Sequence, residues 1–289
     1  MSEMVAQVIG VTKNYDGFSL SNISFDVKKG TVMAVLGDSG SGKTRILDSM
    51  MNMINIDGGK IKIFGCDVDK VEKKVKKDMA VIWGDYCFDD GMTVTGMNLV
   101  FKNIYKNWSE ETYFSNLENL SILPNTNIKY LPKGTNICIQ MAAALSHDSK
   151  LIIIDEPTAD MDEMYIPKLK KMVQEYVKDS DNCVLYFSRG NKDFDEVADY
   201  VTVLDKGKIL ISGKKERILE RHGIIKYVKG KPFKIDASLI VGFEKSSTGA
   251  VILINNRNEF KKKYPSIPVG DATLEDILKY YTLDNTTKS

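Results

Sequence analysis

Residues 37–44 read Gly37-Asp38-Ser39-Gly40-Ser41-Gly42-Lys43-Thr44, and this stretch carries the strongest structural signal in the sequence. The spacing matches G-x-x-x-x-G-K-[ST], a loop that binds phosphate groups. Its glycines let the backbone curl so that successive N–H groups point at an anion. Residues 31–36 form a short apolar run typical of a buried parallel strand, and residues 43–53 suit a helix, whose N-terminus favours an anion. The stretch therefore predicts a phosphate-binding loop between a strand and a helix.

The residues of this loop have separate roles in binding a nucleoside triphosphate, most simply ATP with Mg²⁺. Lys43 can reach the β- and γ-phosphates, and the Thr44 hydroxyl can ligate the metal ion. The candidate nucleotide-binding residues in this stretch are Gly37, Asp38, Ser39, Gly40, Ser41, Gly42, Lys43, Thr44 and Arg45.

A second stretch supports this prediction with two carboxylates at the end of an apolar strand. It reads Leu151-Ile152-Ile153-Ile154-Asp155-Glu156. An acidic residue at such a strand end can hold Mg²⁺ through its water shell, which makes Asp155 a metal candidate beside Thr44. The next carboxylate, Glu156, is placed to polarise an attacking water molecule. Glu156 and Lys43 are therefore the catalytic candidates.

The composition is that of an ordinary globular protein. The chain has 289 residues and a net charge of +1, so no overall basic field indicates nucleic acid or membrane lipid as a partner. Its four cysteines are scattered without the spacing of a zinc or redox site, as in a reduced cytosolic protein. The first ten residues lack the regions of a signal peptide, and no apolar stretch is long enough to span a bilayer. Any membrane-embedded part must therefore come from another chain.

Strands that alternate with helices predict an α/β fold with parallel strands. Residues 93–147 are mostly helical in pattern, and Asp205-Lys206-Gly207 predicts a hairpin turn. The pattern changes after Gly223. There we expect a hairpin over 238–243 and 250–255 and a short helix over 273–281, capped by Asp271 or Thr273.

Residues 3–222 resemble the ATP-binding subunit of an ABC transporter. Residues 151–158, Leu-Ile-Ile-Ile-Asp-Glu-Pro-Thr, resemble the Walker B strand of that family, and Ala159-Asp160-Met161-Asp162 resembles its D-loop. Tyr15 stands where the family has an aromatic residue that stacks on adenine; the alternative is an exposed tyrosine in a turn. The resemblance implies a P-loop NTPase of ABC type with a core mixed sheet and a helical subdomain at about 88–148. It places the ATP-binding domain at 1–222 and a small α+β accessory domain at 223–289.

The C-terminal part resembles the ends of bacterial exporter ATPases that handle antibiotics or amphipathic peptides, such as phenol-soluble-modulin exporters. The resemblance lies in Glu220-Arg221-His222-Gly223-Ile224 and Thr273-Leu274-Glu275-Asp276-Ile277. It implies a transmembrane permease partner and a homodimer or heterodimer of ATP-binding subunits. It also implies a cytoplasmic location on the inner face of the cell membrane.

Two positions depart from that family near the site. No glutamine lies between the phosphate loop and the helical region, and Gly84 takes the place of the Q-loop glutamine. The adjacent Asp85 could reach the metal ion instead. Neither histidine follows the strand over 183–187, and Arg189 occupies the place of the switch histidine. Arginine can bond a γ-phosphate but cannot shuttle a proton. Arg189 is thus a catalytic candidate, or alternatively only a partner in a surface salt bridge.

The third departure is the signature loop, which reads Leu131-Pro132-Lys133-Gly134 where the family has Leu-Ser-Gly-Gly. That loop contacts the γ-phosphate of ATP held by the opposite subunit, and Pro132 offers neither a hydroxyl nor an N–H. The alternative is that this loop only begins a helix.

Two functional hypotheses follow from these departures. The chain is either a working ATPase subunit that powers a transporter, or mainly a nucleotide-binding allosteric subunit paired with a different active ATPase. A soluble DNA-repair or translation ATPase is disfavoured, because the sequence has neither a long coiled-coil insertion nor a second cassette.

Overall fold

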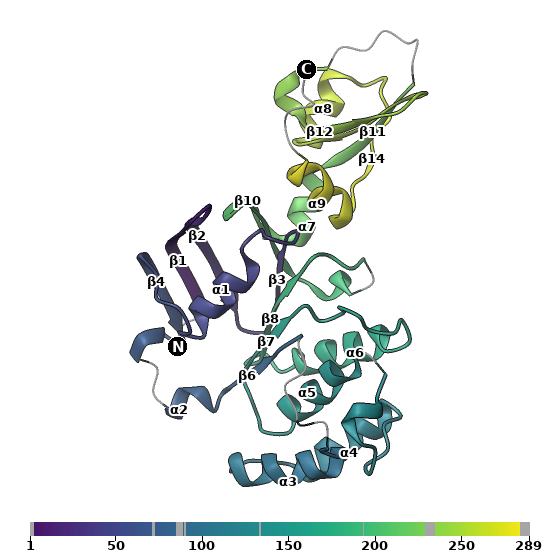
Figure 1. Cartoon of the computed structure of the whole chain (residues 1–289). Coiled ribbons are helices and arrows are strands. Elements are labelled where there is room, and N and C mark those ends of the chain that lie inside the picture. Colours follow the sequence, from purple (N-terminus) through teal and green to yellow (C-terminus); the bar gives the residue numbers. More distant parts are fainter. Residues whose placement is uncertain are drawn as a thin grey trace.

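The computed structural model describes residues 3–70, 73–84, 89, 91–132, 134–192, 194–228 and 235–283 (Figure 1). The strands are β1 (Met4–Tyr15), β2 (Phe18–Lys28), β3 (Val32–Leu36), β4 (Gly58–Ile63), β5 (Cys66–Asp67), β6 (Met79–Ile82), β7 (Leu151–Asp155), β8 (Cys183–Ser188), β9 (Tyr200–Asp205), β10 (Lys208–Lys214), β11 (Gly223–Val228), β12 (Ile240–Lys245), β13 (Gly249–Ile254) and β14 (Gly270–Asp271). The α-helices are α1 (Lys43–Met50), α2 (Lys73–Lys76), α3 (Val94–Ile104), α4 (Glu110–Asn119), α5 (Thr135–Leu145), α6 (Ile166–Tyr176), α7 (Lys215–Arg221), α8 (Arg257–Lys263) and α9 (Leu274–Thr282). None of the helices in these ranges is long and apolar enough to cross a membrane.

The central layer is a six-stranded sheet in the order β10-β9-β3-β8-β7-β6. Its strands are parallel except β10, which pairs antiparallel with β9. All residues of β3 and β8 are buried, because both faces of the sheet are covered. This explains why these strands are short uninterrupted apolar runs in the sequence, and it confirms the predicted mixed sheet.

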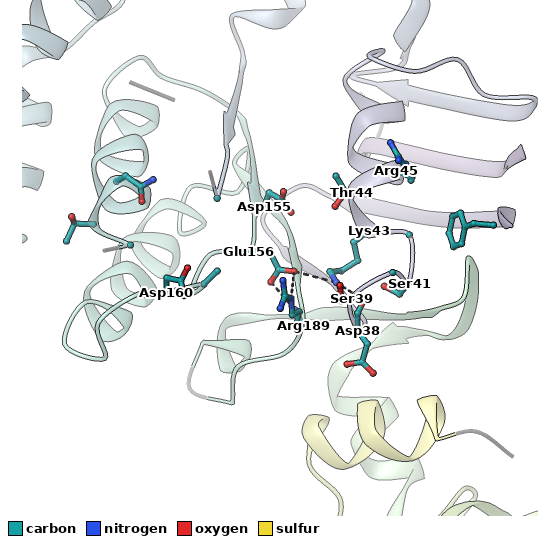
Figure 2. Close-up of a pocket in the computed structure, with 18 of the residues that line it drawn as sticks. Asp38, Ser39, Ser41, Lys43, Thr44, Arg45, Asp155, Glu156, Asp160 and Arg189 are labelled. Carbon is teal, nitrogen blue, oxygen red and sulfur yellow. Dashed lines mark hydrogen bonds and ion pairs between the residues drawn. The ribbon is translucent and has the colours of Figure 1, made fainter. Parts of the chain in front are cut away.

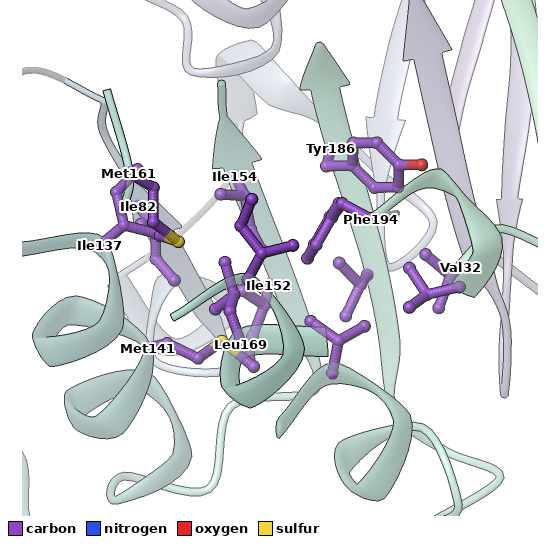
Figure 3. Packing of buried hydrophobic residues seen from close by; sticks show 14 of the residues in the cluster. Val32, Ile82, Ile137, Met141, Ile152, Ile154, Met161, Leu169, Tyr186 and Phe194 are labelled. Carbon is purple, nitrogen blue, oxygen red and sulfur yellow. The ribbon is translucent and has the colours of Figure 1, made fainter. Parts of the chain in front are cut away.

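The two faces of this sheet bury alternate residues of each strand. One face, which includes Ile152, Ile154 and Tyr186, packs against α5 and α6 (Figure 3). The other, which includes Ile153 and Phe187, packs against α1 and an antiparallel sheet in the order β2-β1-β4-β5. Each large apolar side chain buried in this way contributes roughly 1.5–3 kcal/mol.

The helical region lies at one end of the molecule and the C-terminal part at the other (Figure 1). Helices α3 and α4 begin at capping side chains, since the hydroxyl oxygens of Thr93 and Ser109 accept the backbone N–H groups of Gly96 and Thr112. The helical content predicted for residues 93–147 is therefore confirmed.

The C-terminal part contains a four-stranded antiparallel sheet in the order β12-β13-β11-β14. The predicted hairpin is present as β12 and β13, and the predicted last helix as α9, which Thr273 caps. The sequence did not predict α7, β11 or α8. A small core around Phe260 belongs to this part alone, whereas Ile277 and Leu278 of α9 pack in the main core. The division at residue 222 stays a prediction.

The predicted β9–β10 hairpin turn directly contacts the phosphate-binding loop. Gly207 has a φ of +73°, and its N–H donates to the Ser41 carbonyl oxygen at an N···O distance of 2.9 Å. A Cβ atom added to Gly207 would lie 1.8 Å from the Ser19 carbonyl oxygen. The turn therefore requires glycine both for its left-handed backbone and for space.

We expect Gly207→Ala to lower the free energy of unfolding by more than the roughly 1–2 kcal/mol that a left-handed alanine costs by itself. The extra loss arises because the β2 backbone at Ser19 must move. The matched control is Gly65→Ala, where φ is +79° but no atom lies within 4 Å of the added Cβ. Urea unfolding measures both variants, and equal losses would contradict the steric argument.

Candidate functional site

The phosphate-binding loop, residues 37–44, leaves the end of β3 and enters α1 as predicted. Its first residue is packed so closely that only glycine fits, since a Cβ on Gly37 would lie 2.3 Å from the Leu204 carbonyl oxygen. Gly40 and Gly42 have φ values of +78° and +110°, which allow the sharp curl of the loop. The loop lines a cavity of about 1320 Å³ (Figure 2).

Lys43 is buried and lies across this loop. Its ammonium group donates to the carbonyl oxygens of Gly37 and Asp38, at N···O distances of 2.6 and 3.2 Å. It also forms an ion pair with the Glu156 carboxylate at 3.5 Å. Burial lowers the pKa of Lys43, and the nearby Glu156 opposes this shift. The side chain is therefore held in the curl where a phosphate group would bind.

The donors around the loop fit a triphosphate. The Ser41 hydroxyl is buried and has no hydrogen-bond partner among the described residues. It lines the cavity together with Lys43 and Thr44, near the N-terminus of α1. Such donors, with one cation and an α-helix N-terminus, favour an oxyanion ligand. Asp155, which also lines the cavity, is the described carboxylate suited to a metal ion beside Thr44.

Glu156 lies between two cationic side chains (Figure 2). It follows β7 with a φ of +46°, a left-handed conformation that is costly for a residue other than glycine. Its carboxylate accepts the Arg189 backbone N–H at 3.1 Å and forms ion pairs with Lys43 at 3.5 Å and with Arg189 Nε at 3.7 Å. The Arg189 side chain is 68% exposed, so its guanidinium group reaches the cavity from solvent.

The described part of the signature loop lines the same cavity. Leu131, Pro132 and Gly134 contribute to its wall, whereas Lys133 lies outside the described residues. Gly134 begins α5 with a φ of +77°, and a Cβ there would lie 2.4 Å from Cα of Met161. The loop is thus packed directly on the D-loop segment, whose Asp160 also lines the cavity.

Gly84 lies beside the carboxylate pair, as predicted for the Q-loop position. A Cβ on Gly84 would lie 3.1 Å from the Asp155 carbonyl oxygen. The predicted metal candidate Asp85 lies outside the described residues. The sequence analysis missed Gln140 of α5, whose side chain amide accepts from the Trp83 N–H at 3.1 Å and donates to the Trp83 carbonyl at 3.0 Å. The helical region is therefore bonded to the backbone next to Gly84.

Tyr15 lies in the wall of the cavity, as expected for a residue that stacks on a base. The Arg45 guanidinium group lies 5.0 Å from the centre of its ring, a cation–π distance. The Tyr15 hydroxyl is buried without a hydrogen-bond partner among the described residues. Arg45 and Tyr15 thus form one end of the cavity, with the phosphate-binding loop next to them.

A buried acid, Asp195, was also missed. Its carboxylate accepts the Tyr186 hydroxyl at 2.9 Å and the Asn191 N–H at 2.8 Å. Burial raises the pKa of Asp195 to about 6, although both hydrogen bonds oppose this shift. The only signal in the sequence is Tyr186 within an otherwise apolar strand, because a buried tyrosine hydroxyl requires a partner.

Comparisons with known proteins agree with this geometry. A sequence model of the ABC transporter family matches residues 20–159. The phosphonates import ATP-binding protein PhnC of Fusobacterium nucleatum is 31% identical over 179 residues, which are 56% of this chain and 72% of that protein. The xylose import ATP-binding protein XylG of Geobacillus kaustophilus is 29% identical over 242 residues, which are 79% of this chain. The chain spans about half the length of XylG, 48%.

The fold has close structural counterparts. The structure of cbiO1 from Clostridium perfringens, part of the ABC transporter complex cbiONQ, superposes with a TM-score of 0.64 at 21% identity. The match covers 76% of this chain and 92% of that chain. The predicted ABC-type fold is confirmed.

The raised pKa of Asp195 predicts that the free energy of unfolding depends on pH. Its pKa is raised from 3.8 to about 6 in the folded protein, so the unfolded chain loses this proton at lower pH. The free energy of unfolding is therefore higher at low pH. It falls by up to about 3 kcal/mol as the pH rises from below 3.8 to above about 6. We expect Asp195→Asn to remove this loss. Urea unfolding at pH 4.5 and 7.5 measures the difference, with the exposed Asp26→Asn as the control. An unchanged pH dependence in Asp195→Asn would contradict the prediction.

Proposed function

Because this chain belongs to the ATP-binding subunits of ABC transporters, we propose that it converts binding and hydrolysis of MgATP into work on a membrane permease. ATPases of this family bind ATP with Mg²⁺ and hydrolyse it. The observation that carries the proposal is the position of Glu156, within 3.5 Å of Lys43 on the phosphate-binding loop. This contact brings the proposed catalytic carboxylate to the proposed phosphate site.

The site residues have the following proposed roles. Tyr15 and Arg45 bind the base, and residues 37–44 bind the phosphates through backbone N–H groups and Lys43. Thr44 and Asp155 would hold Mg²⁺, which neutralises part of the phosphate charge. Glu156 orients the attacking water, and the Arg189 guanidinium bonds the γ-phosphate. For Asp85 a metal-binding role remains a prediction from sequence.

Slow turnover of the isolated chain is part of this proposal. The Glu156 carboxylate forms ion pairs with two cations and also accepts the Arg189 backbone N–H, so fewer of its lone pairs are available to an attacking water molecule. Arg189 stays protonated, so it cannot exchange a proton as the family's histidine can. Pro132 in the signature loop has no N–H for a phosphate on an opposite subunit. These three features support the second hypothesis, an allosteric subunit paired with a more active ATPase in a heterodimer; a homodimer is the alternative.

We expect the purified protein to bind MgATP and to release phosphate slowly. Lys43→Ala removes the buried phosphate-binding cation and should weaken ATP binding at least about tenfold, equivalent to about 1.4 kcal/mol. Glu156→Gln should keep binding and lose turnover. Calorimetry and phosphate release measure these effects, and Lys102→Ala, an exposed lysine of α3, is the matched control.

Two outcomes would contradict either the allosteric hypothesis or ATP binding at Lys43. Rapid phosphate release by the chain alone, lost in Glu156→Gln, would exclude the allosteric hypothesis. Unchanged ATP affinity in Lys43→Ala would contradict both hypotheses.

We propose that the permease docks in a second, largely apolar pocket beside β6, which would hold this subunit on the inner face of the cell membrane. The pocket has a volume of about 430 Å³ and includes Met53, Trp83, Phe101 and Tyr105. Phe101 lies in α3, and Tyr105 directly follows that helix. Met53 is 64% exposed, which suits it for contact with an apolar segment of another chain.

Met53→Lys should therefore reduce co-purification with the membrane subunit without changing ATP affinity. Val228→Lys in the C-terminal part is the matched control, because Val228 is 60% exposed and lies outside the pocket. Equal capture of the permease by wild type and Met53→Lys would refute this docking site.

The predicted export of peptides or antibiotics has no support from the relatives named above, both of which are named import proteins. Export stays a prediction. Reconstitution with the co-purified permease in vesicles, followed by measurement of which side accumulates the solute, would decide the direction.

A further inference from the structure

Gly190, which directly follows Arg189, is enclosed between two side chains from different parts of the chain. Its φ is +101°, and an added Cβ would lie 3.0 Å from Leu278 Cδ2 and 3.8 Å from Asp195 Oδ2. Leu278 belongs to α9 in the C-terminal part, more than eighty residues later in the sequence. In Figure 2 the yellow C-terminal helices lie below the loop that carries Arg189.

On its inner side, the segment after β8 is held by hydrogen bonds. Asp195 accepts the Asn191 N–H at 2.8 Å, and the Ser188 hydroxyl accepts the Gly190 N–H at 3.0 Å. The Asn191 side chain in turn accepts the Phe194 N–H at 3.1 Å. These bonds fix the curvature of the loop. The Leu278 side chain is the apolar contact on Gly190 from the C-terminal part.

Helix α9 connects this contact to the rest of the C-terminal part. Ile277, Leu278 and Tyr280 are buried in the main core together with Phe194. On the other side, Gly242 of β12 packs on α9, because an added Cβ there would lie 2.7 Å from the Tyr280 carbonyl oxygen. The Tyr281 hydroxyl also hydrogen-bonds His222 Nε2 at 2.8 Å, at the start of the C-terminal part. A shift of α9 is therefore transmitted to both the C-terminal sheet and Gly190.

The position of residue 189 matters to the site in two ways. Its backbone N–H donates to Glu156 at 3.1 Å, and its guanidinium group pairs with the same carboxylate. A displacement of the Gly190 backbone thus moves the proposed phosphate-contacting cation and also releases the carboxylate proposed to orient water. A misplacement of about 1 Å can lower the rate of such a step on the order of a hundredfold.

We infer that Leu278 is a positioning residue for Arg189 and Glu156, so that the seating of the C-terminal part controls the rate of ATP turnover. This inference rests on the proposed function. Leu278 is not among the residues that line the cavity around the phosphate-binding loop in the described part of the chain, so the effect should fall on kcat and leave ATP affinity unchanged.

The test compares Leu278→Ala with Leu239→Ala in the full chain. Leu239 is 3% exposed in the separate C-terminal core, so its truncation destabilises that core without removing the contact with Gly190. We expect Leu278→Ala to lower kcat by at least about fivefold with KM for ATP unchanged within about twofold. Leu239→Ala should keep the wild-type kcat, and the conservative Leu278→Met should restore most of the activity.

Hydrogen exchange of the nucleotide-free protein provides a second readout that does not depend on turnover. The amides of residues 189–191 should exchange faster in Leu278→Ala than in wild type, and at the wild-type rate in Leu239→Ala. If Leu278→Ala does not fold, Leu278→Val is measured in the same way. A wild-type kcat and wild-type exchange in the folded Leu278 variant, or equal kcat losses in both truncations, would overturn the inference. Failure of the wild type to bind MgATP would instead overturn the proposed function, with the exchange result still deciding the contact.

Discussion

The parallel register of three strands determines where the phosphate-binding loop, Glu156 and Arg189 lie. Leu36 of β3 pairs with Ser188 of β8, and Asp155 of β7 pairs with Phe187. Because parallel strands end at one edge of a sheet, the phosphate-binding loop, Glu156 and Arg189 leave the sheet at the same place. Glu156 then forms ion pairs with Lys43 of the loop and with Arg189, which joins the three segments. A slip of one residue between β7 and β8 would turn the side chains of the strand to the opposite face, and the packing of both faces therefore specifies this register.

The sequence predicted those parts of the fold and site whose physical cause is local. The glycine spacing of residues 37–44 specifies a curled loop by itself, and the apolar run before Asp155 specifies a buried strand with a carboxylate at its end. Hairpin turns and the Thr273 cap are local in the same sense. Strand β11 was missed because its alternation is weak and its partners, β13 and β14, lie later in the chain. The roles of Gln140 and Asp195 depend on burial and on distant partners, which no local pattern records.

The surroundings of Gly84 and Arg189 show how the chain accommodates these two departures from the family pattern. Gly84 packs closely against the Asp155 backbone, and the two hydrogen bonds between Gln140 and Trp83 join the helical region to the sheet one residue earlier. Arg189 supplies a permanent charge where the family has a titratable ring. Arg189 and Lys43 both form ion pairs with the Glu156 carboxylate. The two cations therefore compete for this carboxylate until an anion binds Lys43. The site therefore has a buried cation available for an anion, while its proposed catalytic carboxylate is paired with two cations.

The C-terminal part packs against the loop that carries Arg189, through the contact of Leu278 with Gly190. Arg189 stands on a loop whose inner side is hydrogen-bonded to Asp195, and whose Gly190 meets α9. A glycine at 190 has the conformational freedom that this left-handed φ requires, and the same freedom makes the loop deformable once its packing is removed. Hydrogen bonds on one side set its shape, and packing from α9 on the other side adds to the restraint. This contact is the one through which we propose that α9 acts on Arg189 and Glu156, at a distance from the nucleotide.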